Sequence, residues 1–287
     1  MPRSFRSRPR VQILLTVWTV VLALALLGGP ALSAWPWGPR AHPLLNRYAI
    51  ANLPDPLRTA MARHADQLAT LAVAADERKS TDADEAVRHF IDIDLYGTYP
   101  FADVPRDLAT LVARYGEAPV RANGLLPWAI LQTTEKLSAQ MRAGDPAMWA
   151  TAADLGHYAA DANMPLHTTE NYNGQQTGNT GAHALFEDTL IDANWNDALF
   201  VSRQARSPDD VLGYAFETIV ASYARIAPLL SAMTRAQERF ARTDPRFYAS
   251  IWTEAGPVLV TSMNQAAYDI AVFWLAAWER AGRPELP

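Results

Sequence analysis

Apolar residues recur every three or four positions along most of this sequence, and that spacing restricts the possible folds more than any other feature. Such spacing places the apolar side chains on one face of an α-helix. The clearest example lies near the end of the chain, where six apolar residues share a helical face: Ala267, Ile270, Ala271, Trp274, Leu275 and Trp278. Gly282 and Pro284 follow this stripe, in the order that typically ends a helix.

The same pattern occurs in other parts of the chain. Five further stretches have helical spacing, which are residues 43–54, 55–73, 125–144, 146–163 and 209–242. Pro228 interrupts the last of them. Runs of alternating polar and apolar residues, which would indicate strands, are scarce. We therefore predict an all-α fold with a single helical domain. Tryptophans at helical spacing are expected in its core, among them Trp149, Trp274 and Trp278.

The first 34 residues have the layout of a secretory signal peptide. Residues 1–10 contain four arginines and no acidic residue, residues 11–29 are mostly apolar, and small residues follow up to Ala34. The apolar stretch is also close to the length of a membrane span, so a retained N-terminal anchor is the alternative. We expect residues 1–34 to direct the protein to a secreted or periplasmic location, and residues 35–287 to form the folded domain.

Charge and cysteine content narrow the classes of function. The chain has 25 basic and 30 acidic side chains, a net charge of −5, and loss of the four leader arginines would leave −9. An acidic protein lacks the broad basic surface that follows a nucleic-acid backbone. Bound divalent cations would change the field locally, so a phosphate-binding site stays open. Because the chain has no cysteine, an exported domain must be stabilised by its core or by metal.

Half of the six histidines lie between residues 157 and 187. His157 precedes Asp161 by four residues and His183 precedes Glu187 by four, so each pair shares one face of a helix. His167 lies between the pairs, after a proline, where we expect a loop to begin. Imidazole nitrogen and carboxylate oxygen are the ligands that Zn²⁺ takes when cysteine is absent. One pair alone would be weak support, but two pairs with a third histidine between them predict a metal site.

The other three histidines lie earlier in the chain. His89 lies in an apolar-flanked stretch with Asp76 upstream, and His42 lies close to the expected mature N-terminus. The alternative for each is an ordinary histidine on a helix face. For His64, in the segment MARHADQ, we predict a solvent-exposed helix position without a functional role.

These residues fall in four motifs that together resemble the zinc-dependent phospholipase C and single-strand-specific nuclease superfamily. The motifs are WGPRAH, ADERKSTDADEAVRHFIDID, HYAADANMPLH and HALFE, and the resemblance covers roughly residues 37–190. The order His-x3-Asp-x5-His followed by His-x3-Glu looks like the signature of the superfamily. The loop NYNGQQTGNTGAH resembles the form found in bacterial phospholipase C-like members.

The resemblance implies two to three zinc ions and assigns ligands to each. A first zinc would have four ligands, which are Asp76, His89, His157 and Asp161. A second zinc would have three ligands, which are His167, His183 and Glu187.

A third zinc would lie between Asp161 and His42, completed by the amine and carbonyl of an N-terminal tryptophan. The spacing in the superfamily points to Trp37, but a proline precedes it and signal peptidase does not cut there. Cleavage two residues earlier would expose Trp35 instead. In a further arrangement, Asp161 and His42 hold this ion with water alone.

Such a cluster suits the hydrolysis of phosphate esters. Zinc lowers the pKa of bound water from about 15.7 to near 7, and two metals about 3.5–4 Å apart hold the attacking and leaving oxygens. By resemblance, Asp76 would orient or deprotonate the attacking water; the alternative is that it serves only as a ligand. Asp92 and Asp94 would be either partners of the histidine N–H groups or ordinary surface acids.

Three functions follow from these residues. The first is a secreted zinc phosphodiesterase acting on phospholipids, a phospholipase C, with transient membrane-surface contact and no protein partner implied. Glu187 rather than Asp at the last ligand, the absence of cysteine and the acidic charge favour it. The second is a zinc nuclease for single-stranded nucleic acid, in which Trp128 or Tyr172 would stack on bases. The third is a non-catalytic zinc-binding protein, which mixed histidine and carboxylate ligands disfavour.

Overall fold

The computed structural model describes residues 40–287. The expected signal peptide and the two candidate N-terminal ligands, Trp35 and Trp37, lie outside these residues and stay predictions. The first half of the described chain contains α2 (Ala41–Asn52), α3 (Leu57–Arg63), α4 (Ala65–Leu71), α5 (Ala74–Arg78), α6 (Ala83–Ala86), η1 (Ile93–Leu95), α7 (Leu108–Tyr115), α8 (Glu117–Ala122) and α9 (Leu126–Ala143). The second half contains α10 (Met148–Asp161), η2 (Pro165–Thr168), α11 (Ala182–Ala184), η3 (Leu185–Thr189), α12 (Leu190–Asn194), η4 (Asp197–Leu199), α13 (Val211–Tyr223), α14 (Ile226–Arg239) and α15 (Pro245–Arg280).

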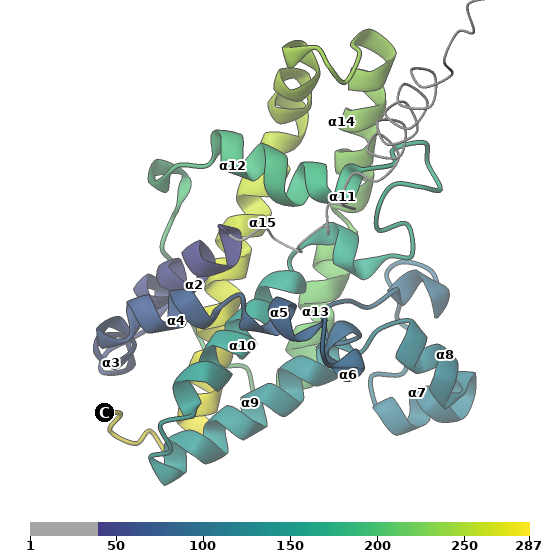
Figure 1. Cartoon of the computed structure of the whole chain (residues 1–287). Coiled ribbons are helices and arrows are strands. Elements are labelled where there is room, and N and C mark those ends of the chain that lie inside the picture. Colours follow the sequence, from purple (N-terminus) through teal and green to yellow (C-terminus); the bar gives the residue numbers. More distant parts are fainter. Residues whose placement is uncertain (1–39) are drawn as a thin grey trace, which may run out of the picture. The chain divides into compact units, whose positions relative to one another are not determined.

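Every regular element between residues 40 and 287 is helical, so the all-α prediction is confirmed (Figure 1). The longest element is α15, with 36 residues, and it packs against α10, α14, α2 and α9. Within the described part of the chain, none of these helices is long and apolar enough to cross a membrane.

The tryptophans predicted for the core are buried. Trp149, Trp274 and Trp278 are 4%, 0% and 7% exposed, and the indole of Trp274 donates a hydrogen bond to the carbonyl of Ala152 in α10. This bond joins α15 to the helix that carries His157. The central helix pair is therefore fixed by both apolar burial and a directional contact.

The helical stripes are more interrupted than the spacing predicts. Residues 55–73 form two helices, α3 and α4, which meet at His64. The ring of His64 stacks on Trp149 with 3.7 Å between centroids, and its Nε2 lies 3.1 Å from the carbonyl oxygen of Pro287. The prediction of a solvent-exposed helix position for His64 is therefore wrong. Residues 209–242 also form two helices, and Pro228 lies in the first turn of α14 rather than at the break.

A glycine inside α10 allows α2 to approach closely. A Cβ atom at Gly156 would lie 2.3 Å from Oδ1 of Asn46, which is fully buried. Asn46 donates a hydrogen bond to the carbonyl of His42 one turn earlier in α2. Because Gly156 directly precedes His157, this close approach brings the first turn of α2 next to the histidine of α10.

Candidate metal centre

All eight residues predicted as zinc ligands lie together in three adjoining groups. His42 comes from α2, Asp76 from α5, and His89 from the bend after α6. The remaining ligands follow in α10, η2, α11 and η3, and the three groups are His42–His157–Asp161, Asp76–His89–His157 and His167–His183–Glu187. Within each group, the candidate ligand atoms lie within 4.8 Å of one another. Their role as ligands stays a prediction.

Four of these residues converge at the end of α10. Nε2 of His157 lies 3.4 Å from Oδ1 of Asp76 and 3.3 Å from Oδ2 of Asp161. Nδ1 of His89 lies 2.9 Å from the same Asp161 oxygen and 3.0 Å from Nε2 of His157. Two imidazole nitrogens and two carboxylates therefore face one point, which is the donor set of a four-coordinate zinc site.

The second group surrounds Glu187. Its Oε2 lies 2.7 Å from Nε2 of His183, and its Oε1 lies 3.3 Å from Nε2 of His167. The sequence predicts a regular α-helix here, but residues Leu185–Thr189 form a π-helical turn. Such turns are rare and frequent at functional sites. The His183–Glu187 contact thus crosses a widened turn rather than an ordinary helical one.

Asp161 joins the groups to each other. Besides its contacts with His89 and His157, its Oδ1 lies 3.6 Å from Nε2 of His42 and 3.4 Å from Nδ1 of His167. The ring of His42 stacks on that of His157, with 3.7 Å between centroids and 10° between planes. A single carboxylate, fully buried, therefore faces histidines from every group.

The second ring nitrogen of three histidines is held by backbone carbonyls. Nδ1 of His157 lies 2.7 Å from the carbonyl oxygen of Ala72, and Nδ1 of His167 lies 2.9 Å from that of His89. Nδ1 of His183 lies 3.3 Å from the carbonyl oxygen of Tyr172. In each case the ring donates from Nδ1, so Nε2 is the nitrogen directed into the group.

Asp92 and Asp94 are therefore not the acceptors for these N–H groups. Asp94 accepts hydrogen bonds from the hydroxyl of Thr169 and the backbone N–H of Glu170. Burial raises the pKa of Asp92 to about 7, and the nearby charges of Asp94 and Glu170 contribute. Asp92 directly precedes η1 and Asp94 lies within it, and neither belongs to the three groups of candidate ligands.

The electrostatics of the centre are those of ionised acids around a protonated histidine. Burial alone would lower the pKa of His157, but Asp161 and Asp76 raise it to about 10. Burial and the charge of His157 lower the pKa of His42 to about 3. Burial alone would raise the pKa of Glu187, yet His183 and His167 lower it to about 2. The histidine charge thus occupies the place where a cation would lie.

Several buried polar atoms at this centre have no hydrogen-bond partner. Among them are both ring nitrogens of His42 and Oδ1 of Asp161. Leaving such atoms unpaired in the interior costs free energy unless a cation satisfies them. The residues present therefore fit a metal ion, and all but His183 are at most 6% exposed.

One residue at the centre was not predicted from the sequence. Nζ of Lys79 lies 2.6 Å from Oδ1 of Asp76, and its side chain is 24% exposed. Lys79 follows Asp76 by three residues at the end of α5, so helical spacing was the available signal. An ammonium group at this position can contact a phosphoryl oxygen of a bound substrate.

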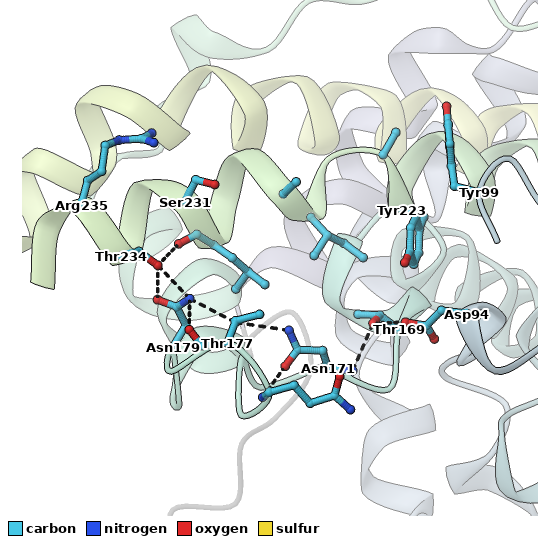
Figure 2. A pocket seen from close by; sticks show the side chains of 15 residues that line it. Asp94, Tyr99, Thr169, Asn171, Thr177, Asn179, Tyr223, Ser231, Thr234 and Arg235 are labelled. Atoms are coloured by element: carbon cyan, nitrogen blue, oxygen red, sulfur yellow. Dashed lines mark hydrogen bonds between the residues drawn. The ribbon is translucent and has the colours of Figure 1, made fainter.

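A cavity of about 770 Å³ is lined in part by residues of the segment 169–179, which lies between His167 and His183 in the sequence; none of the eight candidate ligands lines it. Apolar residues of α14 line one side, including Ile226 and Leu230. Figure 2 shows Asp94 and the rings of Tyr99 and Tyr223 at one end and Arg235 at the other. The cavity thus has an apolar wall on α14 and, at one end, an acidic and aromatic lining formed by Asp94, Tyr99 and Tyr223.

The two aromatic residues predicted to stack on bases have different positions. Trp128 is 4% exposed, donates its indole N–H to the carbonyl of Arg106 and packs on Phe216, so it is not available for a ligand. Tyr172 is 53% exposed, and its ring centroid lies 6.0 Å from that of His183. Only the second residue keeps its predicted place at the site.

Known proteins resemble this chain in fold but not detectably in sequence. Neither a protein family nor a curated protein matches the sequence. A solved structure does match, the alpha toxin from Clostridium absonum, with a TM-score of 0.52. The fold of this chain is therefore similar to the fold of that toxin. The match covers 83% of this chain and 63% of the toxin chain, at 12% sequence identity. At that identity the likeness shows a shared fold and leaves the activity as a separate question.

Proposed function

We propose that this protein is a zinc-dependent phosphodiesterase that hydrolyses phospholipids in the manner of a phospholipase C. One observation carries the proposal: three largely buried groups of histidines and carboxylates adjoin one another, and Asp161 of one group contacts a histidine of each of the other two. Mixed nitrogen and oxygen ligands are typical of zinc sites that keep an open position for water or substrate. A purely structural site would have no need for three adjoining groups.

Each proposed zinc has its ligands among these residues. Asp76, His89, His157 and Asp161 would hold one ion, and His167, His183 and Glu187 would hold a second. His42 and Asp161 would contribute to a third. When bound, zinc supplies a water whose pKa lies near 7 and a positive charge that stabilises the phosphoryl oxygens.

Asp76 and Lys79 would act on the substrate directly. Burial alone would raise the pKa of Asp76, but the charge and the hydrogen bond of His157 hold it well below its usual range, so the carboxylate is ionised at neutral pH. An ionised carboxylate can orient the attacking water and accept its proton. Lys79 lies on the exposed side of Asp76 and would neutralise charge that develops on the phosphoryl oxygens.

The cavity beside the centre supports a lipid as the substrate. Its α14 side offers apolar contact, and its two ends carry opposite charges, Asp94 at one and Arg235 at the other. One charge of each sign suits a zwitterionic lipid better than a polyanionic nucleic acid. Leu95 and Tyr99, which are 43% and 55% exposed, would make the transient contact with a lipid surface.

A single-strand nuclease is the second candidate, favoured by one observation. Tyr172 is exposed next to His183 and can stack on a base that lies over the metal centre. The metal ligands of the two candidates are the same, so the substrate must distinguish them.

The deciding experiment measures metal content and two activities on one sample. We expect two to three zinc ions per chain by elemental analysis, and release of diacylglycerol from phosphatidylcholine that chelation abolishes and zinc restores. Hydrolysis of single-stranded DNA alone would assign the protein to the nuclease branch. Less than one zinc per chain, with neither substrate hydrolysed, would reject the catalytic proposal. Two to three zinc ions without hydrolysis would support the non-catalytic alternative.

We also propose that residues 1–34 are a signal peptide that directs export. Sequencing the N-terminus of the protein recovered outside the cytoplasm tests this. A start at Trp35 or Trp37 would support cleavage and identify the candidate N-terminal ligand, whereas an intact Met1 on a membrane-bound protein would support the retained anchor.

A further inference from the structure

His89 faces the metal centre through the opposite ring nitrogen from three other histidines. His157, His167 and His183 donate Nδ1–H to backbone carbonyls and direct Nε2 inward. In His89, Nδ1 is the inward nitrogen, 2.9 Å from Oδ2 of Asp161. Its Nε2 lies on the other side of the ring and forms no hydrogen bond of ordinary geometry; its ion-pair partner is Oε1 of Glu85, 3.4 Å away and four residues earlier in the chain.

Glu85 is buried, with 3% of its surface exposed, and several neighbouring side chains hold it in place. It accepts a hydrogen bond from the hydroxyl of Tyr158, the residue next to His157 in α10. Its other oxygen accepts a hydrogen bond of 3.2 Å from Nε of Arg78. Arg78 is in turn fixed by Asp154, with 3.0 Å between Nη2 and Oδ1. The carboxylate of Glu85 therefore has a defined position in α6, tied to both α5 and α10.

We propose that Glu85 is a positioning residue that fixes His89 as the Nε2–H tautomer. In that tautomer the lone pair lies on Nδ1, directed at the point that Asp76, His157 and Asp161 also face. A carboxylate acceptor on the outer nitrogen orients the ring and makes the inner nitrogen a stronger ligand. The inference rests on the proposed binding of metal and does not depend on which substrate is hydrolysed.

A purely structural role is the competing explanation, in which Glu85 only neutralises Arg78. The two roles predict different results for zinc affinity. Glu85→Gln keeps the shape of the side chain and removes its charge. Arg78 pairs with two carboxylates, Glu85 and Asp154, and Asp154→Asn makes the same chemical change at the second of them. The ion-pair partner of Asp154 is Arg78, whereas Glu85 pairs with both Arg78 and His89. Asp154→Asn is therefore the matched control.

Zinc affinity is measured by competition with a chelator on the purified full-length variants. We expect Glu85→Gln to weaken the binding of one zinc ion per chain roughly tenfold or more. We expect Asp154→Asn to change it by less than about twofold, within ordinary context dependence. Equal affinities for Glu85→Gln and the wild type would overturn the proposal, as would equal losses in the two variants.

The tautomer itself gives a second readout. In ¹⁵N-edited histidine spectra of the zinc-loaded protein, we expect a protonated Nε2 for His89 and a protonated Nδ1 for His157, His167 and His183. A protonated Nδ1 on His89 would overturn the assignment. If Glu85→Gln does not fold, Tyr158→Phe removes one donor that holds Glu85, and unchanged zinc affinity in that variant would also count against the proposal. Neither readout requires hydrolysis, so a protein that binds zinc without phospholipase activity would fail the proposed function alone.

Discussion

Zinc binding to this centre is predicted to expel close to one proton from His157 at neutral pH. Asp161 and Asp76 outweigh burial and raise the pKa of His157 to about 10 in the metal-free protein. Because Nδ1 of His157 donates to the carbonyl of Ala72, the additional proton resides on Nε2. That nitrogen is the one that faces the carboxylates, and a metal ligand must be deprotonated.

The magnitude follows from the pKa. At pH 7 a group with a pKa of about 10 lacks its proton in roughly one molecule in a thousand, so removing it costs about 4 kcal/mol. Zinc affinity is therefore expected to rise about tenfold per pH unit between about pH 7 and pH 10 from this group alone. His42, with a pKa lowered to about 3, is already neutral and releases nothing. For His183, burial alone would lower the pKa, but the neighbouring Glu187 raises it. His183 therefore adds a further fraction of a proton to the number released when zinc binds.

Calorimetry of zinc binding in two buffers with different ionisation enthalpies counts the protons released. We expect between about one and two per fully loaded chain near pH 7. Identical binding enthalpies in the two buffers would show that no proton leaves, and the placement of His157 among ionised carboxylates as a ligand would then be wrong. The magnesium salt in place of zinc controls for non-specific effects of a divalent cation.

Four further predictions concern single positions. Asp161→Asn is expected to lose zinc from at least two groups, and a full zinc content by elemental analysis would contradict the shared role of Asp161. Lys79→Met is expected to lower kcat about 100-fold with zinc content unchanged, and an unaltered kcat would exclude it from catalysis. Gly156→Ala is expected to lower the free energy of unfolding in urea by about 1–3 kcal/mol, because its methyl group would overlap Asn46; wild-type stability would disprove that close approach. Folding lowers the pKa of Glu187 from 4.5 to about 2, so its ionised carboxylate adds to the free energy of unfolding of the metal-free protein above about pH 4.5. This stabilisation is lost as the pH falls through about 2. Urea unfolding across that range measures the loss, and a Glu187→Gln variant with the same pH dependence would refute it.

The sequence was sufficient to predict the all-α fold, and the structure brings the eight candidate ligands together. The i,i+4 pairs His157–Asp161 and His183–Glu187 are local features, and local spacing directly determines which side chains share a helical face. Helix length was less predictable. The π-helical turn at Glu187 and the break at His64 depend on contacts with distant residues such as Trp149, and no local pattern contains those contacts.

The surroundings of the centre were the least predictable part. The indole N–H of Trp128 donates to the backbone carbonyl of Arg106, a contact that a sequence pattern does not reveal. Asp92 and Asp94 were weighed as histidine partners because of their proximity in sequence. The actual acceptors are backbone carbonyls such as that of Ala72, 85 residues from His157, and every residue type carries such a group. Lys79 is not a usual metal-ligand residue type, so the pattern that predicts the ligands does not include it.

The shared carboxylate of Asp161 has a consequence for the durability of the chain. Its contact with His89 spans 72 residues of sequence, so an ion held between the two closes a large loop. In a chain without cysteine, bound ions would stabilise the fold as disulfide bonds do in other proteins. A chelator, rather than a reducing agent, would remove this stabilisation. The survival of the folded chain among proteases would then follow the supply of zinc, whatever the redox state of its surroundings.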